Sequence, residues 1–141
     1  RNEKVPTEAM ITRNGAMFMR LTGLTKEELL KDSVAAAKSF AQEFNVILVM
    51  KNAVTVVAEP CENGRAYINS SGTGAMSKAG MGDVLTGVIA GMLSLRIEPF
   101  SAACMGVYLH GIAGEIAEEE QGSHSVMAGD VVNILGKAVN K

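Results

Sequence analysis

The sequence has no tryptophan, and only 4% of its residues are aromatic. Proteins that bind single-stranded nucleic acid stack bases on aromatic side chains. The formal net charge of −2 comes with no cluster of Lys and Arg, so nucleic acid is not an expected partner. The two cysteines, Cys61 and Cys104, lack the CxxC or Cys/His spacing of a metal site. We therefore expect two free thiols, no metal-binding side chains and a cytoplasmic protein.

Long apolar runs are missing as well. The longest, near residues 84–95, is too short to cross a bilayer and is interrupted by Gly87 and Gly91. These glycines predict a helix that packs closely on a sheet, and no membrane partner is expected. The polar first residues, RNEKVPTEAM, give no secretory signal.

The order of apolar patterns predicts an α/β layered fold. Strands are expected over 9–12, 46–50, 54–58 and 65–68, and helices over 25–44, 83–95, 99–119 and 130–139. Thr25 and Glu28 have the spacing of a capping box at the start of the first helix. Five apolar residues recur at helical spacing on the face that this helix is expected to bury: Leu30, Val34, Ala37, Ala41 and Phe44.

Five of the fifteen glycines lie in GTGAMSKAGMGDVLTG, residues 72–87, directly before an apolar run. A glycine-rich loop that leads into a helix presents unpaired N–H groups at the positive end of the helix dipole. We therefore predict an anion site in which Gly80 and Gly82 admit the anion to the backbone and Asp83 lies at the helix start. On spacing alone, Asp83 is equally well explained as a helix cap. Lys78 either helps to neutralise the anion or is a solvated loop lysine.

Five segments follow the pattern of one known family. They are RLTGLTKEEL (20–29), VMKNAVTVV (49–57), YINSSGTGAMSKAGMGDVLTGVIAGMLS (67–94), GVYLHGIAGE (106–115) and MAGDVV (127–132). In register over nearly the whole chain, they resemble the ADP/ATP-dependent NAD(P)H-hydrate dehydratases, carbohydrate-kinase-like members of the ribokinase superfamily. The resemblance implies a ribokinase-like α/β fold in which residues 1–141 form the C-terminal half, a β-sheet flanked by helices.

The resemblance also implies a reaction. Enzymes of this family repair hydrated NADH or NADPH: ADP or ATP, with Mg²⁺, phosphorylates the ring hydroxyl, and phosphate then leaves. Asp83 would be the general base and contact the substrate, while Gly80 and Gly82 would hold the transferred phosphoryl group. Gly82 would also contact the nucleotide. The remaining nucleotide-binding residues implied by the resemblance are Lys51, Asn52, Ala53, Val54 and Thr55.

Several positions depart from the family pattern. The segment TRNGAM, residues 12–17, stands where the family carries T-P-H-P-G-E, so Asn14 replaces the substrate-contacting histidine and Met17 replaces the glutamate. Asn52 and Thr73 also differ from the pattern. Two other functions stay open: a ribokinase-like kinase of a small hydroxylated metabolite, and a nucleotide-binding module impaired in catalysis.

Family domains are about twice as long as this chain, which implies an incomplete substrate cleft. We expect the isolated chain to fold, to bind ADP or AMP weakly and not to catalyse the reaction. Its open sheet edge predicts self-association, and a homo-oligomer is expected.

Overall fold

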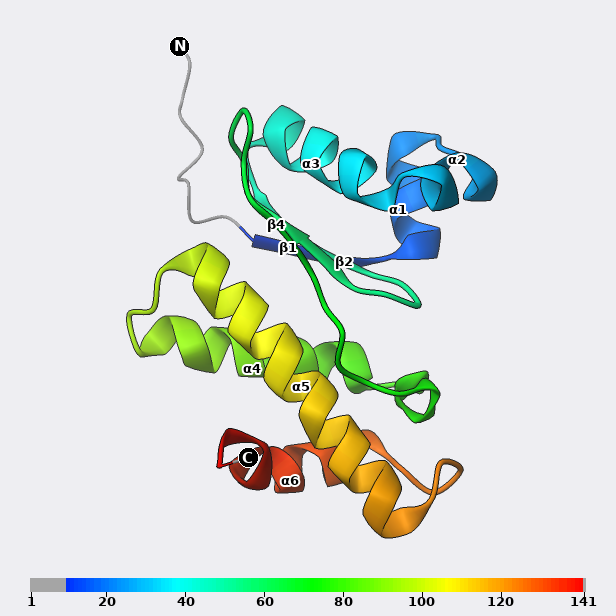
Figure 1. The fold of residues 1–141 in the computed structure, drawn as a ribbon, viewed down its shortest axis with the longest axis vertical. Helices are drawn as coiled ribbons and strands as arrows, with labels where there is room; N and C mark the ends of the chain where they lie inside the picture. Colours follow the sequence, from blue (N-terminus) through cyan, green and yellow to red (C-terminus); the bar gives the residue numbers. More distant parts are fainter. Residues whose placement is uncertain (1–9, 141) are drawn as a thin grey trace. The chain divides into compact units, whose positions relative to one another are not determined.

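The computed structural model describes residues 10–140 (Figure 1). The chain divides into two compact units, Arg1–Asn69 and Ser70–Lys141. Each unit has its own secondary structure, and each is described here by itself.

The first unit contains a four-stranded mixed sheet with the strand order β1-β2-β3-β4. The strands are β1 (Met10–Asn14), β2 (Ile47–Lys51), β3 (Val56–Ala58) and β4 (Ala66–Ile68). β1 and β2 are parallel, whereas β3 and β4 are added by antiparallel pairing. The strands predicted over 46–50, 54–58 and 65–68 are confirmed with small shifts at their ends. The strand predicted over 9–12 is β1, and residue 9 lies outside the described residues.

Three helices connect the two parallel strands, as a parallel pair requires a crossover. They are α1 (Gly15–Thr22), α2 (Lys26–Lys31) and α3 (Ser33–Phe44). Phe18 of α1 and Phe40 of α3 pack with their ring centroids 5.3 Å apart. Both belong to one core cluster with Leu48 and Met50 of β2. The β-branched and apolar run of β2 is buried and supplies the centre of this core.

The prediction of one helix over 25–44 is wrong, because the helix breaks at Asp32. The capping box is confirmed: the Glu28 N–H donates to Thr25 Oγ1 at 3.2 Å, and the Thr25 N–H donates to Glu28 Oε2 at 2.7 Å. Asp32 then leaves the helical region, with φ −154° and ψ 82°, and accepts a bond of 2.9 Å from the Ala35 N–H. Aspartate favours such caps because its side chain satisfies a free backbone donor.

The break also changes which side chains are buried. Leu30 and Phe44, predicted to face the core, are 64% and 50% exposed. Leu29 and Phe40 are buried in their place, whereas Ala37 and Ala41 are buried as predicted. Val34 is half-buried and packs against the same core. A single 3.6-residue period cannot be continued through a residue with extended backbone, which explains the error.

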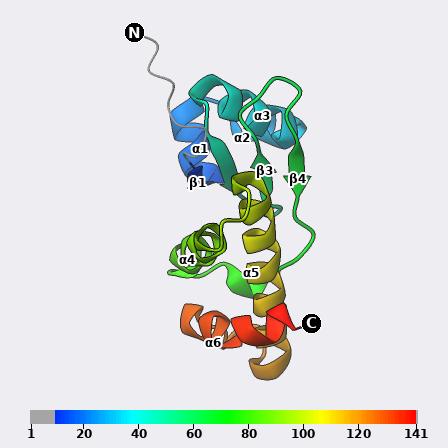
Figure 2. The ribbon, with the colours of Figure 1, turned by 90° about the vertical axis from the view of Figure 1, so that its left-hand side faces the viewer.

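The second unit consists of helices (Figures 1 and 2). They are the short 3₁₀ helix η1 (Gly74–Met76), α4 (Met81–Ser94), α5 (Pro99–Gln121) and α6 (Ala128–Val139). α5 packs against both α4 and α6, and buried residues such as Met81, Ala117 and Ile134 join all three in one core cluster. The predicted helices over 83–95, 99–119 and 130–139 are confirmed, and α4 and α6 each begin two residues earlier than expected.

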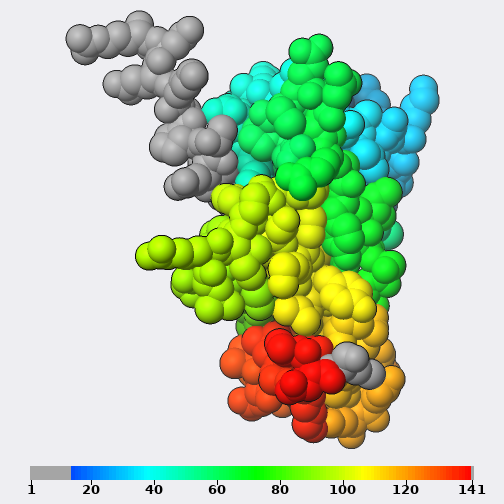
Figure 3. Space-filling model, turned by 60° about the vertical axis from the view of Figure 1, so that its left-hand side comes forward, coloured from blue at the N-terminus to red at the C-terminus, as the bar shows by residue number. Residues whose placement is uncertain are grey.

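Glycines let α5 approach its neighbours closely. A Cβ atom on Gly106 would lie 2.6 Å from Ile89 Cγ1 of α4, and one on Gly114 would overlap the side chain of Met76. The α4 and α6 helices lie side by side on the surface of this unit (Figure 3). None of the helices among the described residues has the length and hydropathy needed to cross a membrane.

Candidate active site

The first turn of α4 carries the predicted anion-binding residues. Gly80 is the N-cap residue with φ +87°, a left-handed conformation that favours glycine, and no side chain caps the helix. The N–H groups of Gly82 and Asp83 form no hydrogen bond with any described residue. Unpaired N–H groups at a helix N-terminus carry partial positive charge. The α4 N-terminal turn (Gly80–Asp83) therefore offers donors that an anion can accept.

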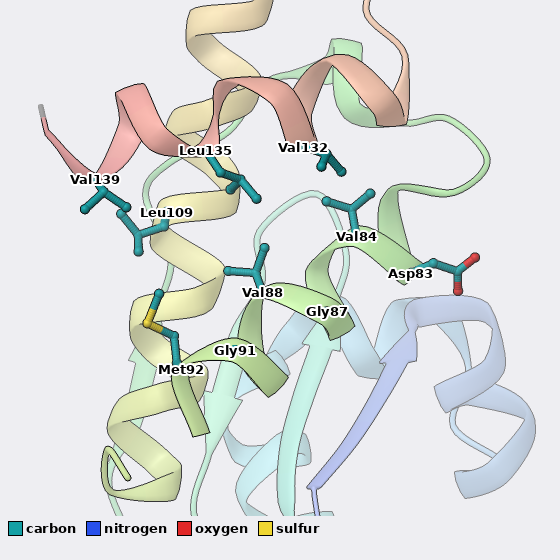
Figure 4. A pocket seen from close by; sticks show the side chains of 10 residues that line it. All are labelled: Asp83, Val84, Gly87, Val88, Gly91, Met92, Leu109, Val132, Leu135 and Val139. Carbon is teal, nitrogen blue, oxygen red and sulfur yellow. The ribbon is translucent and has the colours of Figure 1, made fainter. Parts of the chain in front are cut away.

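Asp83 is the third residue of α4, and its side chain is exposed. No described residue donates a hydrogen bond to its carboxylate or pairs with it. Figure 4 shows the carboxylate turned outward at the end of α4, away from Val84 and Val88. The alternative interpretation of Asp83 as the helix cap is wrong, because Gly80 is the N-cap residue and has no side-chain bond. The carboxylate is thus available to accept a proton.

Two long-range contacts hold the glycine-rich segment before this turn. At its beginning, the Gly72 N–H donates to the Glu115 carboxylate at 2.7 Å. Near its end, the Lys78 ammonium donates to the carbonyls of His124 at 2.8 Å and Val126 at 2.7 Å. Lys78 is therefore not a solvated loop lysine. Both contacts were missed, because no local spacing pattern links residues more than 40 positions apart.

Gly80 also lies against the first turn of α6. A Cβ atom on Gly80 would be 3.1 Å from Ala128 Cβ, and Ala128 is the first residue of α6. The N-termini of α4 and α6 therefore meet beside Gly80. Asp130 caps α6 by accepting a hydrogen bond of 2.8 Å from the Met127 N–H.

The predicted nucleotide segment forms the turn between β2 and β3 in the first unit. Lys51 ends β2 and is half-buried, whereas Asn52, Ala53 and Val54 are exposed. Thr55 is half-buried, and its carbonyl accepts a hydrogen bond of 2.9 Å from the Asn69 N–H.

Asn14 lies at the same end of the sheet. It is paired with Lys51 in the parallel register of β1 and β2, so the carboxyl ends of the two strands bring both residues together. Ligands of α/β proteins commonly bind beyond the carboxyl ends of parallel strands. The exposed Asn14 side chain is the N-cap of α1, where Oδ1 accepts a hydrogen bond of 2.8 Å from the Met17 N–H. Its capping role was not foreseen from the sequence.

The predicted residues thus form two groups. Asn14 and the segment Lys51–Thr55 belong to the first unit, and Gly80, Gly82 and Asp83 belong to the second.

Neither Cys61 nor Cys104 is in a disulfide. Desolvation and the neighbouring Glu59 carboxylate raise the pKa of the exposed Cys61 thiol, which makes it a poor nucleophile. No group of three His, Cys, Asp or Glu side chains among residues 10–140 could hold a metal ion.

A sequence model described as NAD(P)H-hydrate dehydratase matches residues 2–137. The chain belongs to this family. The resemblance inferred from the five motifs is confirmed.

Individual members of the NAD(P)H-hydrate dehydratase family are similar to this chain over most of its length. The "bifunctional NAD(P)H-hydrate repair enzyme Nnr" of Moorella thermoacetica is 40% identical over 126 residues, which are 89% of this chain and 23% of that protein. The ADP/ATP-dependent NAD(P)H-hydrate dehydratase of Bacillus subtilis, crystallised with ATP/Mg²⁺, is 35% identical with a TM-score of 0.86. The match covers 93% of this chain and 47% of that chain.

The expected ribokinase-like α/β fold is also confirmed. A ribokinase-like superfamily protein of Enterococcus faecalis, only 22% identical, shares the fold with a TM-score of 0.75 over 97% of this chain and 46% of that one. The chain therefore spans about half the length of these solved relatives.

Proposed function

We propose that this chain supplies the phosphoryl-binding turn and the general base of a NAD(P)H-hydrate dehydratase. The complete enzyme uses ADP or ATP to phosphorylate the hydroxyl of hydrated NADH or NADPH, and elimination of phosphate restores the cofactor. The observation that carries the proposal is the α4 N-terminal turn. Its unpaired N–H groups and the exposed, unbonded Asp83 carboxylate lie in one turn of a chain that belongs to this family.

Asp83 acts on the proton of the substrate hydroxyl. A general base must reach that proton directly or through one water, and an exposed carboxylate without competing donors can do so. As the proton leaves, the hydroxyl oxygen attacks the terminal phosphorus of the nucleotide. The N–H groups of Gly82 and Asp83 then stabilise the negative charge on the transferring phosphoryl oxygens. The later departure of phosphate from its ring carbon, with loss of a proton from the neighbouring ring carbon to water, forms the ring double bond of NADH or NADPH.

The segment Lys51–Thr55 contributes to nucleotide binding. Its exposed turn leaves the backbone of Asn52, Ala53 and Val54 open to a nucleotide. Lys51 supplies a positive charge at the carboxyl end of β2, and a lysine there suits a phosphate group.

Mg²⁺ is expected to arrive with the nucleotide. The described residues hold no cluster of carboxylate, His or Cys side chains for it. Mg²⁺ commonly keeps several waters and binds through substrate phosphates, which agrees with such a site. The protein residues therefore position the nucleotide, and the metal contributes charge neutralisation when it is bound.

Asn14 contacts the substrate in this proposal. Its Oδ1 atom already caps α1, so its amide NH₂ group is the part left to donate to the substrate. Nucleotide substrates and two thiols outside disulfides suit the cytoplasm, where we place the protein. The edge strand β1 supports the expectation of a homo-oligomer.

The test uses a joined protein, in which this chain replaces the matching 47% of the Bacillus subtilis enzyme. It is incubated with hydrated NADH, Mg²⁺ and either ADP or ATP, and the absorbance of reduced nicotinamide is followed. We expect the absorbance to return only when a nucleotide is present. Nucleotide consumption with other hydroxylated metabolites, but no regeneration of NADH, would favour the kinase alternative and overturn the proposal.

A further inference from the structure

One face of the second unit contains an open apolar groove of about 610 Å³ (Figure 4). α4 contributes Val84, Val88 and Met92, α5 contributes Leu109, and α6 contributes Val132 and Leu135. Val132 is 50% exposed, so part of this apolar wall faces solvent. Apolar surface of this kind is stabilised when another element covers it.

Two glycines of α4 lie along the same groove. Gly87 and Gly91 are one helical turn apart, and apart from the adjoining residues and backbone of α4 itself no described atom lies within 4 Å of the place where a Cβ would stand on either. Glycine weakens a helix interior, so its presence usually reflects a close neighbour. Gly106 of α5 has such a neighbour, since its Cβ would lie 2.6 Å from Ile89. Within the second unit Gly87 and Gly91 have no such neighbour.

We propose that this groove is the docking surface for the other half of the family's domain, through a helix that crosses α4 at Gly87 and Gly91. The chain spans only 47% of the Bacillus subtilis dehydratase and 46% of the Enterococcus faecalis protein, although it shares their fold. Layered α/β domains bury the apolar faces of their helices against the remainder of the domain. The absent Cβ atoms at Gly87 and Gly91 allow a second backbone to approach α4 closely.

The test compares the melting temperature of Gly87→Gln in the isolated chain and in the joined protein. Gly136→Gln is the matched control, because Gly136 also lies in an exposed helix interior, with no described atom within 4 Å, but does not line the groove. In the isolated chain both substitutions should raise the melting temperature by about 1–3 °C, since glutamine is the better helix former.

In the joined protein the two substitutions should change the melting temperature in opposite directions. Gly136→Gln should still stabilise, whereas Gly87→Gln should lower the melting temperature by about 5 °C or more, because its side chain occupies the space of the docked helix. Equal stabilisation by both substitutions in the joined protein would overturn the proposal, as would a joined protein that does not fold with the native Gly87.

Sedimentation of the isolated chain tests whether a second copy of this chain, and not the other half of the domain, occupies the groove. The proposal predicts that any self-association is unchanged by Gly87→Gln. A dimer that Gly87→Gln dissociates and Gly136→Gln does not would make a second copy the occupant and contradict the proposal. Neither measurement depends on activity, so the outcome is independent of the proposed reaction.

Discussion

The ammonium group of Lys78 donates a hydrogen bond of 2.7 Å to the backbone carbonyl of Val126, a residue that is fully buried. With a second bond to the His124 carbonyl, it ties the glycine-rich segment to the connection between α5 and α6. This contact places the α4 N-terminal turn relative to the rest of the second unit.

Lys78→Met should therefore destabilise the chain by about 1–3 kcal/mol, because it leaves the carbonyl of the buried Val126 without its donor. Urea denaturation measures the change. The control is Lys31→Met, since Lys31 is exposed at the end of α2 and its loss should change the free energy of unfolding by no more than about 0.5 kcal/mol. Equal effects of the two substitutions would contradict a holding role for Lys78.

Gly80→Ala should also destabilise the chain, by about 1–2 kcal/mol. A left-handed conformation costs a non-glycine residue about this much, and the new Cβ would press on Ala128. Gly74→Ala is the matched control, because Gly74 lies in the same glycine-rich segment with open space around it and no positive φ. Thermal denaturation of both variants should show a loss for Gly80→Ala alone.

The ion pair of Glu59 and Arg65 predicts a pH dependence. Two side-chain hydrogen bonds from Arg65, with a further bond from its backbone N–H, lower the pKa of Glu59 from 4.5 to about 2. A carboxyl group with a lowered folded-state pKa contributes stability above its unfolded pKa and loses it as the pH falls through its folded pKa. Because the Arg65 side chain is 59% exposed, we expect a contribution of about 1 kcal/mol or less.

Glu59→Gln should accordingly lower the melting temperature at pH 7, and the difference from the unmodified chain should shrink between about pH 4.5 and pH 2. Melting curves recorded across this range check the prediction. A difference that stays constant down to pH 2 would show that the carboxylate charge is not its source.

Much of the fold could be predicted because its signals are local. The β-branched run of β2 and the capping box of Thr25 and Glu28 act through neighbouring residues, and both were predicted correctly. The interruption at Asp32 was missed, because aspartate is tolerated inside a helix as well as favoured at its start. The packing of Leu29 and Phe40 in the core with the sheet residues favours a break at Asp32 over one continuous helix.

The candidate site could be predicted only in part. The glycine-rich segment indicated a helix N-terminus and placed Asp83 in its first turn, within two residues of the observed start. The contacts that position this turn, from Lys78 and from Glu115, join segments far apart in the sequence. The parallel pairing that sets Asn14 opposite Lys51 is likewise a property of the folded sheet.

The most direct test of the central claim is the turnover of hydrated NADH by the joined protein carrying Asp83→Asn, with ADP or ATP and Mg²⁺. Asparagine keeps the shape of the side chain but cannot accept the hydroxyl proton as a base. We expect nucleotide affinity to stay within about threefold in a binding titration, and turnover to fall by about 10²–10⁴-fold. Turnover close to that of the unsubstituted joined protein would contradict the role of Asp83 as the general base.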